Sequence, residues 1–230
     1  MRKIPDKWLG EEIKGSLERV LKEPQSNIVR PRNTNPIIVP NIDGYIYVPS
    51  TNLLVAKQRT HLGESWDKAR NSLKQEGSFM MNLYEFAEFL RYLKTNPNQE
   101  NSTIYEDITA VRNPYRAEWL DAKFSENVGK MFVDYDKSIN GKRESLHETL
   151  KGYLDKNRTP GIDLEKWIDN HTIQGFPRER IKKGDLYYWA PVDGRVARFG
   201  AYSDGADLSC DGGPTGSYSR LGVRAAREKK

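Results

Sequence analysis

The sequence has one cysteine, Cys210, and three histidines among its 230 residues. A single cysteine excludes an intramolecular disulfide and a four-cysteine zinc site. No stretch approaches the roughly 18 consecutive apolar residues of a membrane-spanning helix. The charged start is followed by no apolar signal segment. We therefore expect no membrane span and no signal peptide, and the sequence leaves the compartment open.

A strong excess of one charge is also missing. Lys and Arg number 37 against 32 Asp and Glu, which gives a net charge of +5. The charges are interspersed, and only the tail at 227–230 is a basic cluster, so the sequence predicts no nucleic-acid partner. Apolar residues make up 37% of the chain, which can supply an ordinary hydrophobic core.

The first 35 residues are predicted to form a helix and a connector. Leu9, Ile13, Leu17 and Val20 recur at helical spacing within residues 7–22, and a polar, proline-containing stretch follows. Such a helix could support oligomer formation. We expect one domain over residues 36–227, followed by a basic tail at 228–230.

The pattern within the domain is irregular. Short β-branched and aromatic runs predict strands at 37–39, 45–48, 53–56, 131–133, 186–189, 196–201 and 221–226. Helices are predicted over 65–75, over 82–93 with a capping box at Asn82 and Glu85, and after Asp163. Residues 95–102 are polar, contain Pro97 and predict a surface loop. Because helices and strands do not alternate as βαβ units, the predicted class is α+β with an antiparallel sheet.

Signals for catalysis are weak. Cys210 lies on the apolar side of an alternating segment, which is typical of a buried, inert thiol. Asp204, Asp207 and Asp211 do not have the spacing of a calcium loop. Carboxylate pairs such as Glu85 and Glu88 are interpreted as solvated helix positions. The sequence therefore predicts no cofactor, no metal site and no enzyme.

The C-terminal motifs resemble a known family. The sequence Gly-Arg-Val-Ala-Arg-Phe at 194–199, followed by Leu-Gly-Val-Arg at 221–224, is similar to the end of the C-type lectin fold in formylglycine-generating-enzyme-like domains. Val223 stands where the family usually has an aromatic residue. Further motifs occur in the family's order at 77–81, 116–122, 174–177 and 186–191. The chain looks most like the variable proteins of diversity-generating retroelements.

The resemblance implies a C-type lectin-like fold with an antiparallel sheet, two main helices and a long C-terminal loop region between strands. It also implies adenine-directed mutagenesis, in which an altered Asn codon never yields Lys, Glu, Gln, Met or Trp. Residues 190–227 contain none of these five in 38 residues, although the whole chain contains 50. Residues 26–56 also lack all five, so the absence supports the resemblance without deciding it.

The resemblance further implies a variable ligand-binding region at about 190–226. Framework positions would be Phe199, Ala201, Ala206, Leu208, Leu221 and Val223. The expected ligand-binding, variable positions fall between them: Gly200, Tyr202, Asp204, Gly205, Asp207, Ser209, Asp211, Gly212, Gly213, Gly216, Tyr218 and Arg220. Tyr202, Tyr218 and Arg220 are the expected energetic anchors, because Tyr and Arg are enriched at interface hot spots.

The expected partner is an unknown protein or cell-surface ligand, bound without turnover. The catalytic activity of formylglycine-generating relatives does not carry over, because it uses a pair of thiols and this chain has one. The alternative that stays open is an enzyme or metal site that uses Cys210. A structural protein that assembles through the N-terminal helix is compatible with the binding hypothesis.

Overall fold

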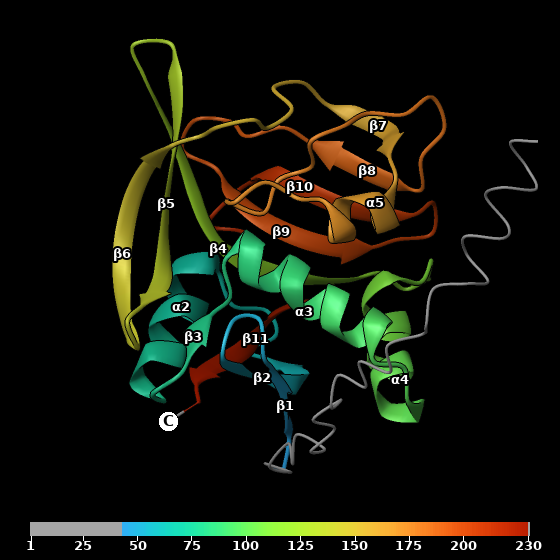
Figure 1. The fold of residues 1–230 in the computed structure, drawn as a ribbon. Helices are drawn as coiled ribbons and strands as arrows, with labels where there is room; N and C mark the ends of the chain where they lie inside the picture. Colours follow the sequence, from blue (N-terminus) through green and yellow to red (C-terminus); the bar gives the residue numbers. More distant parts are fainter. Residues whose placement is uncertain (1–42, 230) are drawn as a thin grey trace, which may run out of the picture. The chain divides into compact units, whose positions relative to one another are not determined.

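The computed structural model describes residues 43–229 (Figure 1). The predicted N-terminal helix at 7–22, its connector and the predicted strand at 37–39 lie outside the described residues. Within 43–229 the chain forms a large mixed sheet and four helices.

The sheet has eleven strands. Its main path runs in the order β1 (Tyr45–Val48), β2 (Leu53–Thr60), β11 (Leu221–Glu228), β4 (Arg116–Asn127), β9 (Val196–Ala201), β10 (Ala206–Gly212), β8 (Leu186–Trp189) and β7 (Arg158–Ile162). The short β3 (Phe79–Met80) pairs with β11, and the hairpin of β5 (Lys130–Ile139) and β6 (Lys142–Thr149) extends from β4. The hairpin turns at Asn140 and Gly141, which both have positive φ as the Asn-Gly pair predicts.

The prediction of an antiparallel sheet is wrong for two pairings. β10 runs parallel to β8, and β11 runs parallel to β4, whereas the other pairings are antiparallel. Each parallel pair is separated in the sequence by at least one other strand, so local patterns carry no information on the direction of pairing. The predicted long C-terminal loop region also contains β10, so its loops are the shorter segments at 202–205 and 213–220.

The described helices are α2 (Trp66–Gln75), α3 (Leu83–Thr95), α4 (Gln99–Thr109) and α5 (Leu164–Asp169). The predicted capping box is confirmed: the Asn82 side chain accepts from the Glu85 amide, and Glu85 accepts from the Asn82 amide. The predicted loop at 95–102 is confirmed only for residues 96–98, because Asn98 caps α4 and Pro97 precedes that helix rather than interrupting it.

Helices cover the two sides of the sheet unequally. On one side α3, α4 and α5 pack on Phe199, Leu208 and neighbouring strand residues to form the main core, and Figure 1 shows α3 and α5 lying across the strands. On the other side α2 packs through Trp66, Ala69 and Leu73 over β4 and β11. In this second cluster no described helix packs against β8 or β10. On this side of the sheet, these two strands are therefore not covered by a helix of the cluster.

Candidate ligand-binding face

The six expected framework positions are all buried. Phe199, Ala206 and Leu208 point into the main core, Leu221 and Val223 pack in the cluster beneath α2, and Ala201 is buried beside Ala206. Because side chains alternate between the two faces of a strand, the residues between them on β9 and β10 point to the side opposite the main core. The register aligns Gly200 with Asp207 and Arg198 with Ser209, so the two sets form one surface.

β8 extends this surface on its far side. It pairs with β10 so that Tyr187 lies beside Asp207 and Trp189 lies beside Ser209. We call the resulting surface the outward face. It consists of Tyr187, Trp189, Arg198, Gly200, Asp207, Ser209 and Asp211.

A cavity of about 180 Å³ opens at one end of the outward face. It is lined by three aromatic residues, two aspartates and a glycine: Tyr187, Trp189, Tyr202, Asp204, Gly205 and Asp207. Four of these six are among the expected ligand-binding positions. We call this the aromatic cavity.

Two glycines make room for the aromatic rings. A Cβ on Gly200 would come within 2.5 Å of Tyr202 Cε2, so the Tyr202 ring lies directly over the strand. A Cβ on Gly205 would come within 3.0 Å of Tyr187 Cε2. The Tyr202 ring also stacks on Tyr115, with a centroid separation of 5.4 Å and an interplanar angle of 10°. The expected variable positions are therefore coupled by packing.

Asp207 has the most strongly shifted pKa on the outward face. Burial raises its pKa to about 7, while Arg198 and a hydrogen bond from Trp189 oppose this shift and Asp211 and Asp204 add to it. Trp189 Nε1 donates to Asp207 Oδ2 at 3.2 Å. Among residues 43–229, neither Asp207 Oδ1 nor Arg198 Nε has a hydrogen-bond partner, although both atoms are buried. Leaving such polar atoms unpaired costs roughly 1–3 kcal/mol each.

Two other expected positions on β10 are less available. Ser209 is only 1% exposed, and its hydroxyl donates to Asp211 Oδ1 at 2.7 Å. Gly212 is also buried, and a Cβ there would lie 2.9 Å from the Val196 carbonyl oxygen. Both positions are therefore less accessible to a ligand than we expect from the resemblance. Ser209 instead holds the partly buried Asp211 carboxylate in place.

The remaining expected positions lie in the 213–220 segment. This segment packs on the chain around 63–66, where the Trp66 amide donates to the Pro214 carbonyl at 3.0 Å. Tyr218 is 56% exposed, and Arg220 is exposed as well. Neither these two nor Gly213 and Gly216 line the aromatic cavity. The structure thus divides the expected site into a cavity and a separate exposed loop.

Sequence reasoning missed three residues of the outward face. Trp189 is only partly buried, lines the aromatic cavity and donates a hydrogen bond to Asp207. Tyr187 lines the same cavity, and Arg198 approaches Asp207 from β9. Because the sequence predicts a strand at 186–189, its period of two, which puts Tyr187 and Trp189 on the same face, is the signal that could have found two of them.

The residues that could support catalysis, Cys210 and the carboxylates Glu85 and Glu88, are buried away from the outward face. Cys210 is fully buried in the main core, and burial raises its pKa well above the ordinary value. Glu85 and Glu88 are 4% and 2% exposed, so the interpretation as solvated carboxylates is wrong. Glu85 pairs with Arg143, and Glu88 pairs with Arg91 and His171. In the described part of the chain, no group of three or more His, Cys, Asp or Glu residues is arranged to hold a metal ion.

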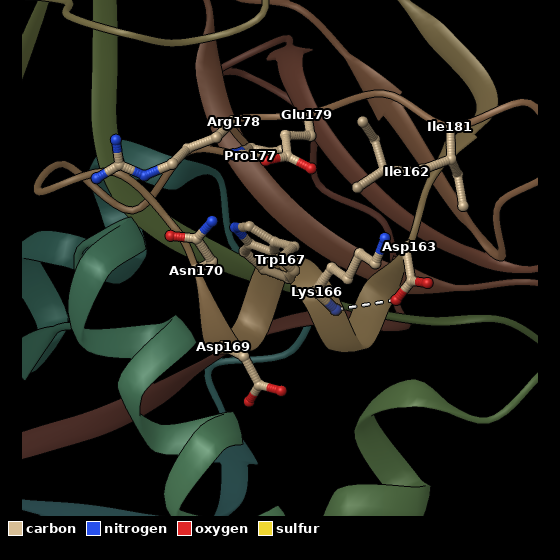
Figure 2. A pocket seen from close by; sticks show the side chains of 10 residues that line it. All are labelled: Ile162, Asp163, Lys166, Trp167, Asp169, Asn170, Pro177, Arg178, Glu179 and Ile181. Carbon is tan, nitrogen blue, oxygen red and sulfur yellow. Dashed lines mark hydrogen bonds between the residues drawn. The ribbon is translucent and has the colours of Figure 1, made fainter. Parts of the chain in front are cut away.

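A larger cavity of about 290 Å³ lies between α5 and residues 177–181 (Figure 2). Trp167 and Ile162 provide apolar walls, and Asp163, Lys166 and Arg178 are among the charged residues around it. Asp163 is occupied as the cap of α5, since its Oδ1 accepts from the Lys166 amide at 2.9 Å. Trp167 Nε1 donates to the Gly175 carbonyl. This cavity contains none of the expected positions, and two of its polar groups, the Asp163 carboxylate and the Trp167 indole, already have partners.

Comparison with protein-family models, with curated proteins and with solved structures finds no match. Among the described helices, none combines the length and apolar character needed to cross a membrane. The functional argument therefore depends on the residues of the outward face.

Proposed function

We propose that this protein binds a ligand, without turnover, through the outward face and the 213–220 loop, and that this region varies between copies of the gene. The scaffold would be C-type lectin-like, of the kind that variable proteins of diversity-generating retroelements use. The observation that carries the proposal is the separation of roles along β9 and β10. Framework side chains fill the core, while the intervening positions lie on the opposite face or in the adjoining loops.

This separation suits a diversified receptor because a core side chain and a ligand contact are never required of the same position. Phe199 and Leu208 stabilise the fold from one face, and Asp207 can change on the other. β11 follows the 213–220 loop and pairs with β2 and β4, so both ends of the variable segment are held in the sheet. Loops fixed in this way carry binding function in many scaffolds.

The ordered motifs and the codon argument support the same proposal. The family-like segments at 116–122, 186–191 and 221–224 fall on β4, β8 and β11, which adjoin or flank β9 and β10 in the sheet. The absence of Lys, Glu, Gln, Met and Trp from residues 190–227 fits adenine-directed change in this region.

The alternative with Cys210 as nucleophile or metal ligand is less well supported. A thiol must be ionised to attack or to bind a metal, and burial raises the pKa of Cys210. The side chain also faces the main core rather than the outward face.

Sequencing the encoding locus in many individuals of one population tests the proposal. We expect substitutions at codons for outward and loop positions such as 202, 204, 207, 218 and 220, arising at adenines. A near-identical repeat and a reverse-transcriptase gene should lie nearby. Codons 26–56 are the matched control, because they lack the same five amino acids and should be invariant. An invariant 190–226 segment with no repeat would overturn the proposal.

A further inference from the structure

The aromatic cavity combines aromatic rings with acidic groups. Tyr187, Trp189 and Tyr202 contribute rings, Asp204 and Asp207 contribute carboxylates, and no Lys or Arg lines it. Aromatic faces attract cations through the ring quadrupole, and the Trp ring does so more strongly than the Tyr ring. The cavity volume of about 180 Å³ limits the occupant to a single side chain or a small molecule.

The local charge opposes that of the whole chain. Asp204, Asp207 and Asp211 give three negative charges against one positive charge from Arg198, a formal sum of −2, in a chain with a net charge of +5. No ion pair within 4 Å joins Arg198 to Asp207 among the described residues. Arg198 therefore neutralises the charge of the three aspartates only in part.

We propose that the aromatic cavity binds a basic side chain of a protein ligand, a lysine ammonium or an arginine guanidinium, with Asp207 as its counter-charge. This inference rests on the proposed function and names the chemistry of its ligand. Asp207 lines the cavity, and its buried Oδ1 has no partner within residues 43–229, so a ligand N–H group that reaches this oxygen as the carboxylate turns toward it would supply the missing hydrogen bond.

The cavity walls are held in place before any ligand arrives. Tyr115 stacks on the Tyr202 ring, and the Tyr187 ring lies against Gly205. The indole of Trp189 is fixed by its hydrogen bond to Asp207 Oδ2. Fixed walls reduce the entropy cost of binding. The same indole N–H reports on occupancy, because it contacts the carboxylate that the cation would approach.

Titration of the full ¹⁵N-labelled chain with Nα-acetyl-lysine-N-methylamide and with the arginine analogue tests the inference by NMR. The Trp189 indole signal is assigned with Trp189→Phe. We expect at least one basic probe to shift this signal and the neutral norleucine analogue to bind about tenfold more weakly. Asp207→Asn should weaken the basic probe by about tenfold, whereas the exposed Asp155→Asn should leave its affinity unchanged.

Equal binding of the lysine, arginine and norleucine analogues, binding unaffected by Asp207→Asn, or no binding of either basic probe would overturn the inference. The backbone amide spectrum of Asp207→Asn verifies that the variant is folded. The locus experiment is independent of these results. Variation without basic-probe binding would reject only the basic ligand, and basic-probe binding at an invariant locus would reject only the diversification.

Discussion

The Tyr202 ring lies over the α-carbon of Gly200, so that a Cβ on Gly200 would meet Tyr202 Cε2 at 2.5 Å. Both residues are expected variable positions, yet the ring fits only because residue 200 has no side chain. A larger residue at 200 must displace the ring from its stack on Tyr115. Variation at these two positions should therefore be correlated.

A double-mutant cycle tests this coupling. Gly200→Ala alone should lower the free energy of unfolding by about 1–2 kcal/mol, because it overpacks the strand against the ring. In the Tyr202→Ser background the same substitution should cost less than about 0.5 kcal/mol. Urea denaturation of the four proteins measures both values. Equal costs in the two backgrounds would show that the ring does not depend on Gly200.

A buried ion cluster formed by residues of β4 and β11 gives a second prediction. Glu118 pairs with Arg116 and with Arg224, each at 3.1 Å, and all three are at most 2% exposed. Burial alone would raise the pKa of Glu118, but the two arginines lower it below the ordinary value. Glu118→Gln should reduce the free energy of unfolding at pH 7 by about 3–5 kcal/mol, because it removes the carboxylate partner of buried Arg224 and leaves buried Arg116 with Asp107 alone.

The control for this variant is Glu100→Gln. Glu100 is a surface carboxylate that pairs with Lys57 at 2.7 Å, and its loss should cost less than about 1 kcal/mol. Because the folded pKa of Glu118 is lowered, its stabilisation is present above the unfolded value of about 4.3 and is lost as the pH falls below it. The difference between wild type and Glu118→Gln should narrow in acid. Similar losses for both variants at pH 7 would contradict the role of the cluster.

The sequence predicted elements wherever the signal is local. The capping box at Asn82 and the turn at Asn140 are read from residues three or fewer apart, and both are confirmed. Helix α4 was missed because its composition is polar and only Asn101, Ile104 and Ile108 are buried along it. Three buried positions in eleven residues give too weak a period to outweigh Pro97.

The candidate site was predictable in part for the same reason. Strand alternation places Asp207 on the face opposite the core, and its pairing with Gly200 agrees; beyond Ser209 the register shifts, so alternation alone does not place Asp211. Trp189 was missed because β8 joins β10 by a parallel pairing between distant segments. The buried carboxylates were missed because their partners are distant: Arg143 reaches Glu85 from 58 residues away, and Arg224 reaches Glu118 from 106.

Cys210 should react slowly in the folded protein. It is fully buried, and burial raises its pKa, so both access and ionisation oppose alkylation. Reaction with iodoacetamide at neutral pH should be on the order of 100-fold slower than after denaturation. The control is Cys210→Ser combined with Ser217→Cys, which moves the thiol to an exposed loop position. Rapid alkylation of native Cys210 would restore the enzyme alternative.

The stability of the protein should depend on Asp207 in a defined pH range. Burial, opposed by Arg198 and Trp189 and reinforced by Asp211 and Asp204, raises its folded pKa to about 7. The cavity wall beside it also includes Tyr202, whose own pKa is raised by burial. The folded state therefore holds the Asp207 proton more tightly than the unfolded state, where the pKa is about 3.9. Asp207 should lower stability as the pH rises from about 4 to 7, with no further loss above.

Asp207→Asn removes this pH-dependent contribution to stability, and the asparagine side chain has a shape similar to that of aspartate. Relative to wild type, it should raise the free energy of unfolding by about 2 kcal/mol more at pH 8 than at pH 4.5, a value reduced for the partial exposure of the group. Urea denaturation at both pH values measures this, with Asp155→Asn as the control for the loss of one charge. A bound basic side chain stabilises the carboxylate, so saturating acetyl-lysine-methylamide should flatten the wild-type curve. If the probe leaves the pH dependence of wild-type stability unchanged, the ionised Asp207 carboxylate does not take part in binding the probe.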